Sequence, residues 1–234
     1  MDEDGETKKD VEVWQVLVHV CRRWRSIVFG SKRRLNLRLF CTSKISVRDM
    51  LDIWPPLPLF VLDARHDSPI EDVDNTIAAL KQRHHRVCKI KFCAGSSSHL
   101  KTVWAAMQEP FPELVDITLF TLSADAGIPD TFLGGSAASA PGLRCLKLDG
   151  ISFPGLPKLL SSTTHLVTLR LGNTPHSEYT SPEAIVNCLS ALTDLETLAL
   201  GFERHNRESR RPPPPTRSVL PALINFEFTG AIEY

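Results

Sequence analysis

The feature that most constrains this chain is an apolar pattern that recurs at nearly constant spacing. The pattern is L-x-x-L-x-L, with other large apolar residues allowed at the leucine positions. It occurs at "LPLFVL" (57), "VCKIKF" (87), "LVDITL" (114), "LRCLKL" (143), "LVTLRL" (166), "LETLAL" (195) and "LINFEF" (223). The steps between successive starts are 30, 27, 29, 23, 29 and 28 residues. Self-similarity at a fixed period of this size predicts a chain built from stacked, similar units.

Each copy of the pattern predicts a short β-strand. Side chains alternate between the two faces of a strand, so the fourth and sixth positions of a copy share one side, and we expect that side to face the core. The third and fifth positions then point away from the core. The spacing falls at the upper end of the range of leucine-rich repeats and slightly beyond it.

The intervals between the strands read as helices. "SPIEDVDNTIAALKQRH" (68–84) begins with Ser68 as N-cap and Pro69 at the first helical position. "SPEAIVNCLSAL" (181–192) repeats this order, and "SSSHLKTVWAAM" (96–107) has apolar residues at helical spacing. "FPGLPKLLSS" (153–162) is too rich in proline for more than a turn or two, and the interval 123–142 is mostly loop.

Alternating strands and helices predict a parallel sheet. We therefore expect an α/β fold: a leucine-rich-repeat solenoid over 35–234, a curved parallel sheet with helices on its convex side. The segment 203–218, "ERHNRESRRPPPPTRS", is a proline-rich loop that is either a solvated insertion or a ligand for an aromatic-lined groove. The end "FEFTGAIEY" lacks a polar capping repeat, which favours a fragment or a partner that covers this end.

The concave face of such a solenoid is the expected binding surface. The residues predicted there as a partner face are Lys89, Lys91, Asp116, Thr118, Lys147, Thr168 and Arg170, and Cys145, Thr197, Ala199, Asn225 and Glu227 occupy equivalent positions. The fifth-position column contains Lys91, Lys147 and Arg170. It therefore suggests binding of an acidic or phosphorylated partner segment, although these residues could equally be ordinary solvated strand positions.

The stretch "VHVCRRWRSIVFGS" (18–31) lies before the first copy of the pattern. Read as a helix, it contributes to one broad apolar face made of Trp14, Leu17, Val18, Cys21, Trp24 and Val28. Arg22, Arg23, Arg25, Lys32, Arg33 and Arg34 could contact phosphates, and a basic amphipathic helix could lie on a membrane surface. The third interpretation, which we favour, is a helix that packs on the first repeat or on a partner's helices.

The core "VCRRW" (20–24) resembles the closing part of an F-box, and the continuation to residue 64 resembles the segment that follows it in fungal F-box-like proteins with leucine-rich repeats. The chain has no proline before Pro55, so the N-terminal half of an F-box is missing. The resemblance divides the chain into a disordered polar tail (1–10), a partial F-box-like helical segment (11–34) and the repeats. It implies a substrate receptor of a Skp-cullin-F-box ubiquitin ligase.

In that role Trp14, Leu17, Val20, Cys21, Trp24 and Val28 would contact a Skp-type linker subunit, and an unknown protein substrate would bind the concave face. The alternative is a leucine-rich-repeat scaffold without ligase docking, in which the same residues only cap the solenoid. In both interpretations the chain is not an enzyme, because no catalytic, phosphate-binding or metal-ligating motif occurs in it.

Composition indicates which kinds of partner and which cellular compartment to expect. The formal net charge is +0 with a pI near 7.1, which does not favour nucleic acid or membrane as a partner. The six cysteines show no zinc-site spacing and most lie in apolar runs, which predicts a reducing compartment, cytoplasm or nucleus. We expect no cofactor and no metal.

Overall fold

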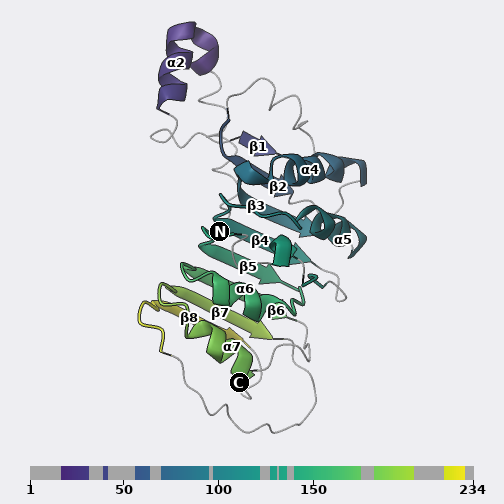
Figure 1. Cartoon of the computed structure of the whole chain (residues 1–234), viewed down its shortest axis with the longest axis vertical. Coiled ribbons are helices and arrows are strands. Elements are labelled where there is room, and N and C mark those ends of the chain that lie inside the picture. The colour runs from purple at the N-terminus through teal and green to yellow at the C-terminus, as the bar shows by residue number, and fades with distance from the viewer. Residues whose placement is uncertain are drawn as a thin grey trace.

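The computed structural model describes residues 17–31, 39–41, 56–63, 70–94, 97–121, 127–130, 132–135, 140–174, 182–202 and 219–229. Eight parallel strands form one sheet whose order follows the chain from β1 to β8 (Figure 1). The strands are β1 (Leu39–Cys41), β2 (Leu59–Asp63), β3 (Val87–Ala94), β4 (Asp116–Thr121), β5 (Cys145–Asp149), β6 (Thr168–Thr174), β7 (Thr197–Phe202) and β8 (Asn225–Thr229). The predicted parallel α/β architecture is confirmed.

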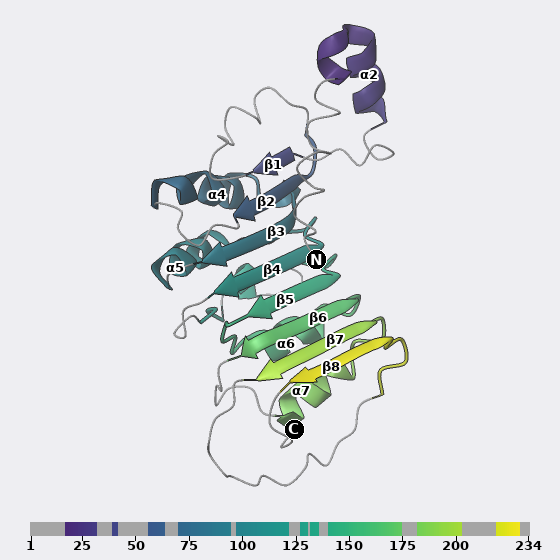
Figure 2. The same cartoon turned by 180° about the vertical axis from the view of Figure 1, so that it is seen from behind.

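The helices between the strands lie on one face of the sheet. They are α4 (Ile70–Gln82), α5 (Ser97–Ala106), α6 (Leu156–Ser162) and α7 (Pro182–Leu189), with the short 3₁₀ helices η1 (His84–Arg86) and η2 (Phe132–Gly135). Seen from behind, the sheet has no described helix in front of its strands (Figure 2). The N-terminal helix α2 (Arg22–Gly30) lies beyond β1, away from the other helices (Figure 1).

The predicted helices match the described ones closely. α4, α5 and α7 fall within the three intervals read as helical, and α6 has the expected length of about two turns. In α5, Leu100, Val103 and Trp104 are buried as the helical spacing requires. The predicted caps Ser68 and Ser181, the first-position Pro69 and the proline-rich loop 203–218 lie outside the described residues.

The core lies between the sheet and these helices. Ile117, Leu146, Leu169 and Leu198 are neighbours in register across β4 to β7, and each is at most 3% exposed. These are the fourth positions of four copies of the leucine pattern. One side of the sheet therefore carries a continuous apolar row, whose burial is the main stabilising contribution of the fold.

A recurrent turn precedes five of the strands. The backbone N–H of the first leucine in each copy donates to a carbonyl three residues earlier, in the pairs Leu114 to Phe111, Leu143 to Ala140, Leu166 to Thr163, Leu195 to Leu192 and Leu223 to Leu220. These leucines are buried except Leu223, which is half-buried. The same turn thus leads into each of the five strands. As a result, residues at equivalent positions of the leucine pattern point to the same face of the sheet.

Aromatic side chains pack in the interval between β4 and β5, whose described residues include the 3₁₀ helix η2 and no α-helix. The ring of Phe132 in η2 makes edge-to-face contacts with Trp104 at 5.5 Å and with Phe153 at 5.6 Å between centroids. All three residues are buried. These contacts keep the core layer continuous from α5 to α6.

Three positions predicted to face the core, Phe60, Leu62 and Phe226, differ from the prediction. In the copy at 57, Val61 pairs with Ile90 and is fully buried, so Val61 and not Phe60 continues the fourth-position row. In the copy at 223, Phe226 pairs with Leu198 but is 62% exposed. Phe226 points to the predicted side of the sheet, the side of Leu198. It is exposed because it lies on the edge strand β8, where little apolar surface covers it.

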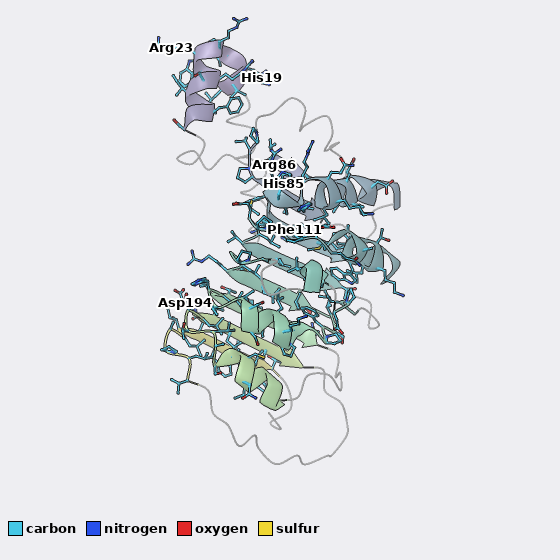
Figure 3. The ribbon with its side chains drawn as sticks, viewed as in Figure 1. His19, Arg23, His85, Arg86, Phe111 and Asp194 are labelled. Atoms are coloured by element: carbon cyan, nitrogen blue, oxygen red, sulfur yellow. The ribbon has the colours of Figure 1, made fainter. Side chains whose placement is uncertain are left out.

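Polar groups secure the start of the sheet. Arg86, labelled beside His85 in Figure 3, donates from Nε and Nη2 to the carbonyl oxygen of Leu57 at 3.1 and 2.7 Å. These bonds tie η1 to the segment that leads into β2. Since Arg86 is half-buried, a carbonyl that satisfies its guanidinium there offsets part of its desolvation cost.

Candidate functional site

The residues predicted as a partner face gather on one side of the sheet. We call this side the outer face and define it by the third and fifth positions of the leucine pattern. Lys89, Asp116, Cys145 and Thr168 are neighbours in register in one row, and Lys91, Thr118, Lys147 and Arg170 in the next. All are half-buried except Arg170, which is exposed. The structure thus brings all seven predicted residues together.

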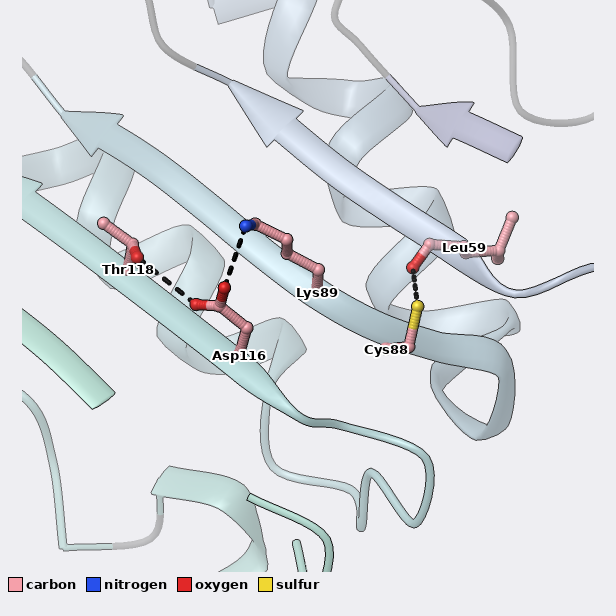
Figure 4. Close-up of polar contacts among 5 residues, drawn as sticks. All are labelled: Leu59, Cys88, Lys89, Asp116 and Thr118. Carbon is pink, nitrogen blue, oxygen red and sulfur yellow. Dashed lines mark hydrogen bonds and ion pairs between the residues drawn. The ribbon is translucent and has the colours of Figure 1, made fainter. Parts of the chain in front are cut away.

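The N-terminal part of the outer face is internally paired. Lys89 Nζ lies 2.8 Å from Asp116 Oδ2, and the Thr118 hydroxyl donates to Asp116 Oδ1 at 3.4 Å (Figure 4). The ammonium also lies 6.0 Å from the ring centroid of Phe60. Because its charge already has a carboxylate and a ring beside it, Lys89 has little left to offer an anionic partner.

Two of the predicted residues could have been paired from sequence. Lys89 and Asp116 are both third positions of consecutive copies, so strands aligned by their leucines place them side by side. In parallel sheets such neighbours are separated by one strand spacing, about 4.8 Å. Opposite charges at equivalent positions of adjacent copies therefore signal an ion pair.

Two thiols, Cys88 and Cys145, lie near this face. Cys88 Sγ donates to the Leu59 carbonyl oxygen at 3.3 Å (Figure 4). Burial, and after it the neighbouring Asp116 carboxylate, raise the pKa of the Cys145 thiol to about 11. At neutral pH Cys145 is therefore a thiol and not a nucleophilic thiolate.

We expect Cys145 to resist alkylation. With its pKa at about 11, roughly one thousandth of this thiol is ionised at pH 8. Iodoacetamide labelling at pH 8, followed by peptide mass spectrometry, should modify the exposed Cys21 well before Cys145. Equal labelling rates at the two positions would contradict the assigned environment.

The C-terminal part of the outer face is hollowed. A depression of about 420 Å³ spans β4 to β8. The side chains that define it are Thr118, Lys147, Asp149, Arg170, Asn173 and Glu227. Among the described residues, Lys147 and Arg170 have no ion-pair partner. This depression is therefore a candidate place for a side chain of another molecule on the outer face.

Acidic and amide groups form the rim of the depression. Asn173 Nδ2 donates to Asp149 Oδ1 at 2.8 Å, and Asn173 adopts a left-handed backbone with φ of +44°. Glu227 is exposed on β8. Asp149 and Asn173 were not predicted as site residues. The signal that could have found them is their place just after the last leucine of their copies, at the carboxyl ends of parallel strands.

The helical segment before the sheet differs from the predicted single helix. Residues 17–20 are helical, Cys21 is extended with φ of −163° and ψ of 170°, and α2 begins at Arg22. Arg25 Nε donates to the Val18 carbonyl oxygen at 3.1 Å across this break. The interruption prevents the predicted residues from forming one continuous apolar face.

Burial divides the predicted docking residues into two groups. Val28 is 1% exposed and Leu17 is half-buried, whereas Cys21 is exposed, and Val20 and Trp24 are 61% and 46% exposed. Val18 of the predicted apolar face is also 1% exposed. Trp14 lies outside the described residues. Sequence reasoning missed Ile27, which is 51% exposed and lies one turn from Trp24. Figure 3 shows His19 and Arg23 on the same segment, away from the sheet.

The described residues contain no group of three or more side chains suited to hold a metal ion. Within the same residues, no helix is both long and apolar enough to cross a membrane. No family model, curated protein or solved structure matches the chain, so the assignment of a function depends on its own residues.

Proposed function

We propose that the chain is a non-enzymatic protein-interaction module, an F-box-like leucine-rich-repeat protein that acts as a substrate receptor of a Skp-cullin-F-box ubiquitin ligase. The sheet with its outer face is a leucine-rich-repeat solenoid that captures the substrate protein. The helical segment at 17–30 docks a Skp-type linker subunit. The ubiquitin-transfer chemistry belongs to other subunits of the ligase.

The observation that carries the docking role is the exposure of large apolar side chains on a short helix. Trp24 and Ile27 lie three residues apart on α2, so they are neighbours on its surface, and about half of each is exposed. A tryptophan and an isoleucine displayed together are typical anchors of a protein interface. The "VCRRW" core that resembles an F-box includes this tryptophan.

The assignment to leucine-rich repeats is supported by structural features that recur in successive strands and the turns before them. The turn before each strand, the register of the leucine rows and the chain-order sheet recur from β4 to β8. Stacked units of this kind leave a long sheet surface available for a partner. A face of half-exposed strand residues suits recognition of an extended protein segment.

Capture by a purified Skp-type linker subunit tests the docking role. We expect the wild-type chain to be retained and the double variant Trp24→Ala/Ile27→Ala to bind about 30-fold more weakly, because two interface anchors are lost. Surface plasmon resonance with immobilised linker measures both affinities.

The matched control removes similar exposed apolar surface at the other end of the molecule. Ile224 and Phe226 are 74% and 62% exposed, so the double variant Ile224→Ala/Phe226→Ala should bind the linker like the wild type. Absence of binding by the wild-type chain, or equal weakening by both double variants, would refute the docking role.

The second candidate function is a leucine-rich-repeat scaffold without ligase docking. The specific observation in its favour is the break at Cys21, which shortens the helical surface available to a linker subunit. In this case α2 serves a structural role through the buried Val28, and the outer face alone binds a partner.

A further inference from the structure

The strand β8 has an open edge. Within the part of the chain that the structure describes, β8 pairs with β7 and with no other strand (Figure 2). Val219, Ile224 and Phe226, in and just before this strand, are all exposed. At the opposite end of the sheet, Leu39 and Cys41 of β1 are buried. The two ends of the sheet therefore differ, and the β8 end displays apolar surface.

The backbone of Phe226 faces the open side of β8. The preceding residue, Asn225, donates its N–H to the Glu196 carbonyl oxygen at 2.9 Å, on the side of β7. Backbone groups of successive strand residues point to opposite edges of the strand, so the N–H and C=O of Phe226 point away from β7. Such an edge can pair with another extended strand.

The features by which proteins commonly protect an edge strand do not occur in β8. The strand Asn225–Thr229 contains neither lysine nor proline, and its register with β7 runs without a bulge. Its one charged side chain, Glu227, lies on the outer face and does not cover the edge. The edge of β8 is therefore regular and competent for pairing.

The sequence of β8 is complementary to itself in the antiparallel direction. A two-fold axis through Phe226 and perpendicular to the sheet places Asn225 of each copy opposite Glu227 of the other, on the same face. The Asn225 amide can donate to the Glu227 carboxylate, and symmetry supplies this bond twice. The two Phe226 side chains become neighbours, and Phe228 of each copy lies beside Ile224 of the other.

The neighbouring symmetric registers are less favourable. An axis through Glu227 places the two carboxylates directly opposite each other, and like charges in such positions repel. An axis through Asn225 places each Glu227 opposite the apolar Leu223, which cannot donate to a carboxylate. Among these three registers, the one centred on Phe226 alone gives every Glu227 a donor. This complementarity favours a second copy of the chain over an unrelated extended segment.

We propose that β8 is a dimerisation edge, at which two copies of this chain pair their β8 strands antiparallel about Phe226. The two sheets join into one continuous sheet, with an α2 helix beyond each far end (Figure 1). An interface built on a strand of five residues is at or below the roughly 1,200 Å² at which ordinary complexes begin. We therefore expect a weak dimer, with a Kd of about 10 µM. The proposal does not depend on the ligase role.

Sedimentation velocity of the full chain between about 1 and 100 µM tests the proposal, and the wild type should change from mainly monomer to mainly dimer over this range. Asn225→Asp sets a carboxylate opposite each Glu227 and should weaken the dimer at least about tenfold. Asn225→Lys sets an ammonium there and should tighten it about threefold. Thr197 and Ala199, which flank these positions on β7, are neutral, so neither substitution changes an ion pair with β7.

A charge reversal tests the register directly. Asn225→Asp/Glu227→Lys restores opposite charges across the two-fold axis and should recover the affinity that Asn225→Asp loses. The matched control, Thr168→Asp, adds a carboxylate to the outer face of β6, two strands from β8, and should leave the Kd unchanged. Circular dichroism and urea denaturation establish that all variants are folded.

Several outcomes would overturn the dimerisation edge. A chain that stays monomeric up to about 100 µM would show that the edge is covered by another segment or by a different protein. Shifts of the Kd in the same direction by Asn225→Asp and Asn225→Lys, or equal weakening by Thr168→Asp, would exclude the proposed register. A dimer that is lost in Trp24→Ala/Ile27→Ala and kept in the β8 variants would place the contact on α2.

Linker binding separates this proposal from the ligase role. Linker affinities are compared at chain concentrations well below the dimer Kd, where the wild type and the variants are all monomers. The Ile224→Ala/Phe226→Ala variant should lose the dimer and still bind the linker like the wild type. Dimerisation by a chain that does not bind the linker refutes only the ligase role, and linker binding by a chain that stays monomeric refutes only the dimer.

Discussion

Replacing Phe111 with alanine is expected to destabilise the protein by about 3–5 kcal/mol. Phe111 is fully buried in the turn before β4, where its carbonyl oxygen accepts the N–H of Leu114 at 3.1 Å and its ring meets His84 edge to face at 6.1 Å between centroids. Figure 3 labels its position. Removal of the ring leaves a cavity that a turn tied to its strand cannot readily close.

Urea denaturation measures this effect, as a lower transition midpoint at unchanged slope. The control is the same substitution at Phe226, which is 62% exposed and should cost less than about 1 kcal/mol. If the two alanine variants lose equal stability, the core does not lie where the structure places it.

Replacing Gly150 with alanine is expected to cost about 3 kcal/mol. Gly150 follows β5 with φ of +69°, a left-handed conformation that side chains other than glycine rarely adopt, and a Cβ atom there would collide with the Thr121 carbonyl oxygen. The backbone of β4 would have to move to admit the methyl group. Since Gly150 lies next to Asp149, binding at the depression should weaken as well.

Gly30 provides the matched control for this substitution. It ends α2, and a Cβ atom there would meet nothing within 4 Å. Alanine at this position should be neutral or stabilise the helix by up to about 1 kcal/mol. Thermal unfolding of the two alanine variants tests the contrast, and a Gly150→Ala protein that unfolds with the wild type would show that the left-handed conformation is not required.

Sequence reasoning predicted the strands best where large apolar residues alternate with polar or small residues within the leucine pattern. β4 to β7 have this alternation, so their core side was assigned correctly from residues such as Leu146 and Leu169. β2 has no such alternation, because "LFVLD" (59–63) is apolar at four consecutive positions. The sequence therefore does not show which alternate residues of β2 face the core. The bulge in the register between β2 and β3, at Leu59 and Phe60, adds a shift that no pattern reveals.

The candidate site was predicted in outline but not in its charges. The alternation placed Lys89, Lys147 and Arg170 on one face, but it does not by itself pair Lys89 with Asp116. That pairing follows only when successive copies are also aligned by their leucines. The break at Cys21 was missed for a related reason. Apolar residues continue at helical spacing on both sides of it, so periodicity alone indicates one helix.

The strict chain order of the sheet has a consequence for how such a protein can change in evolution. Every strand pairs only with the strands that precede and follow it in sequence. A unit of one strand and its connection could therefore be gained or lost by duplication or deletion without breaking any pairing between the units that remain, apart from the one new junction. The length of the outer face can thus vary almost independently of the local geometry that builds it.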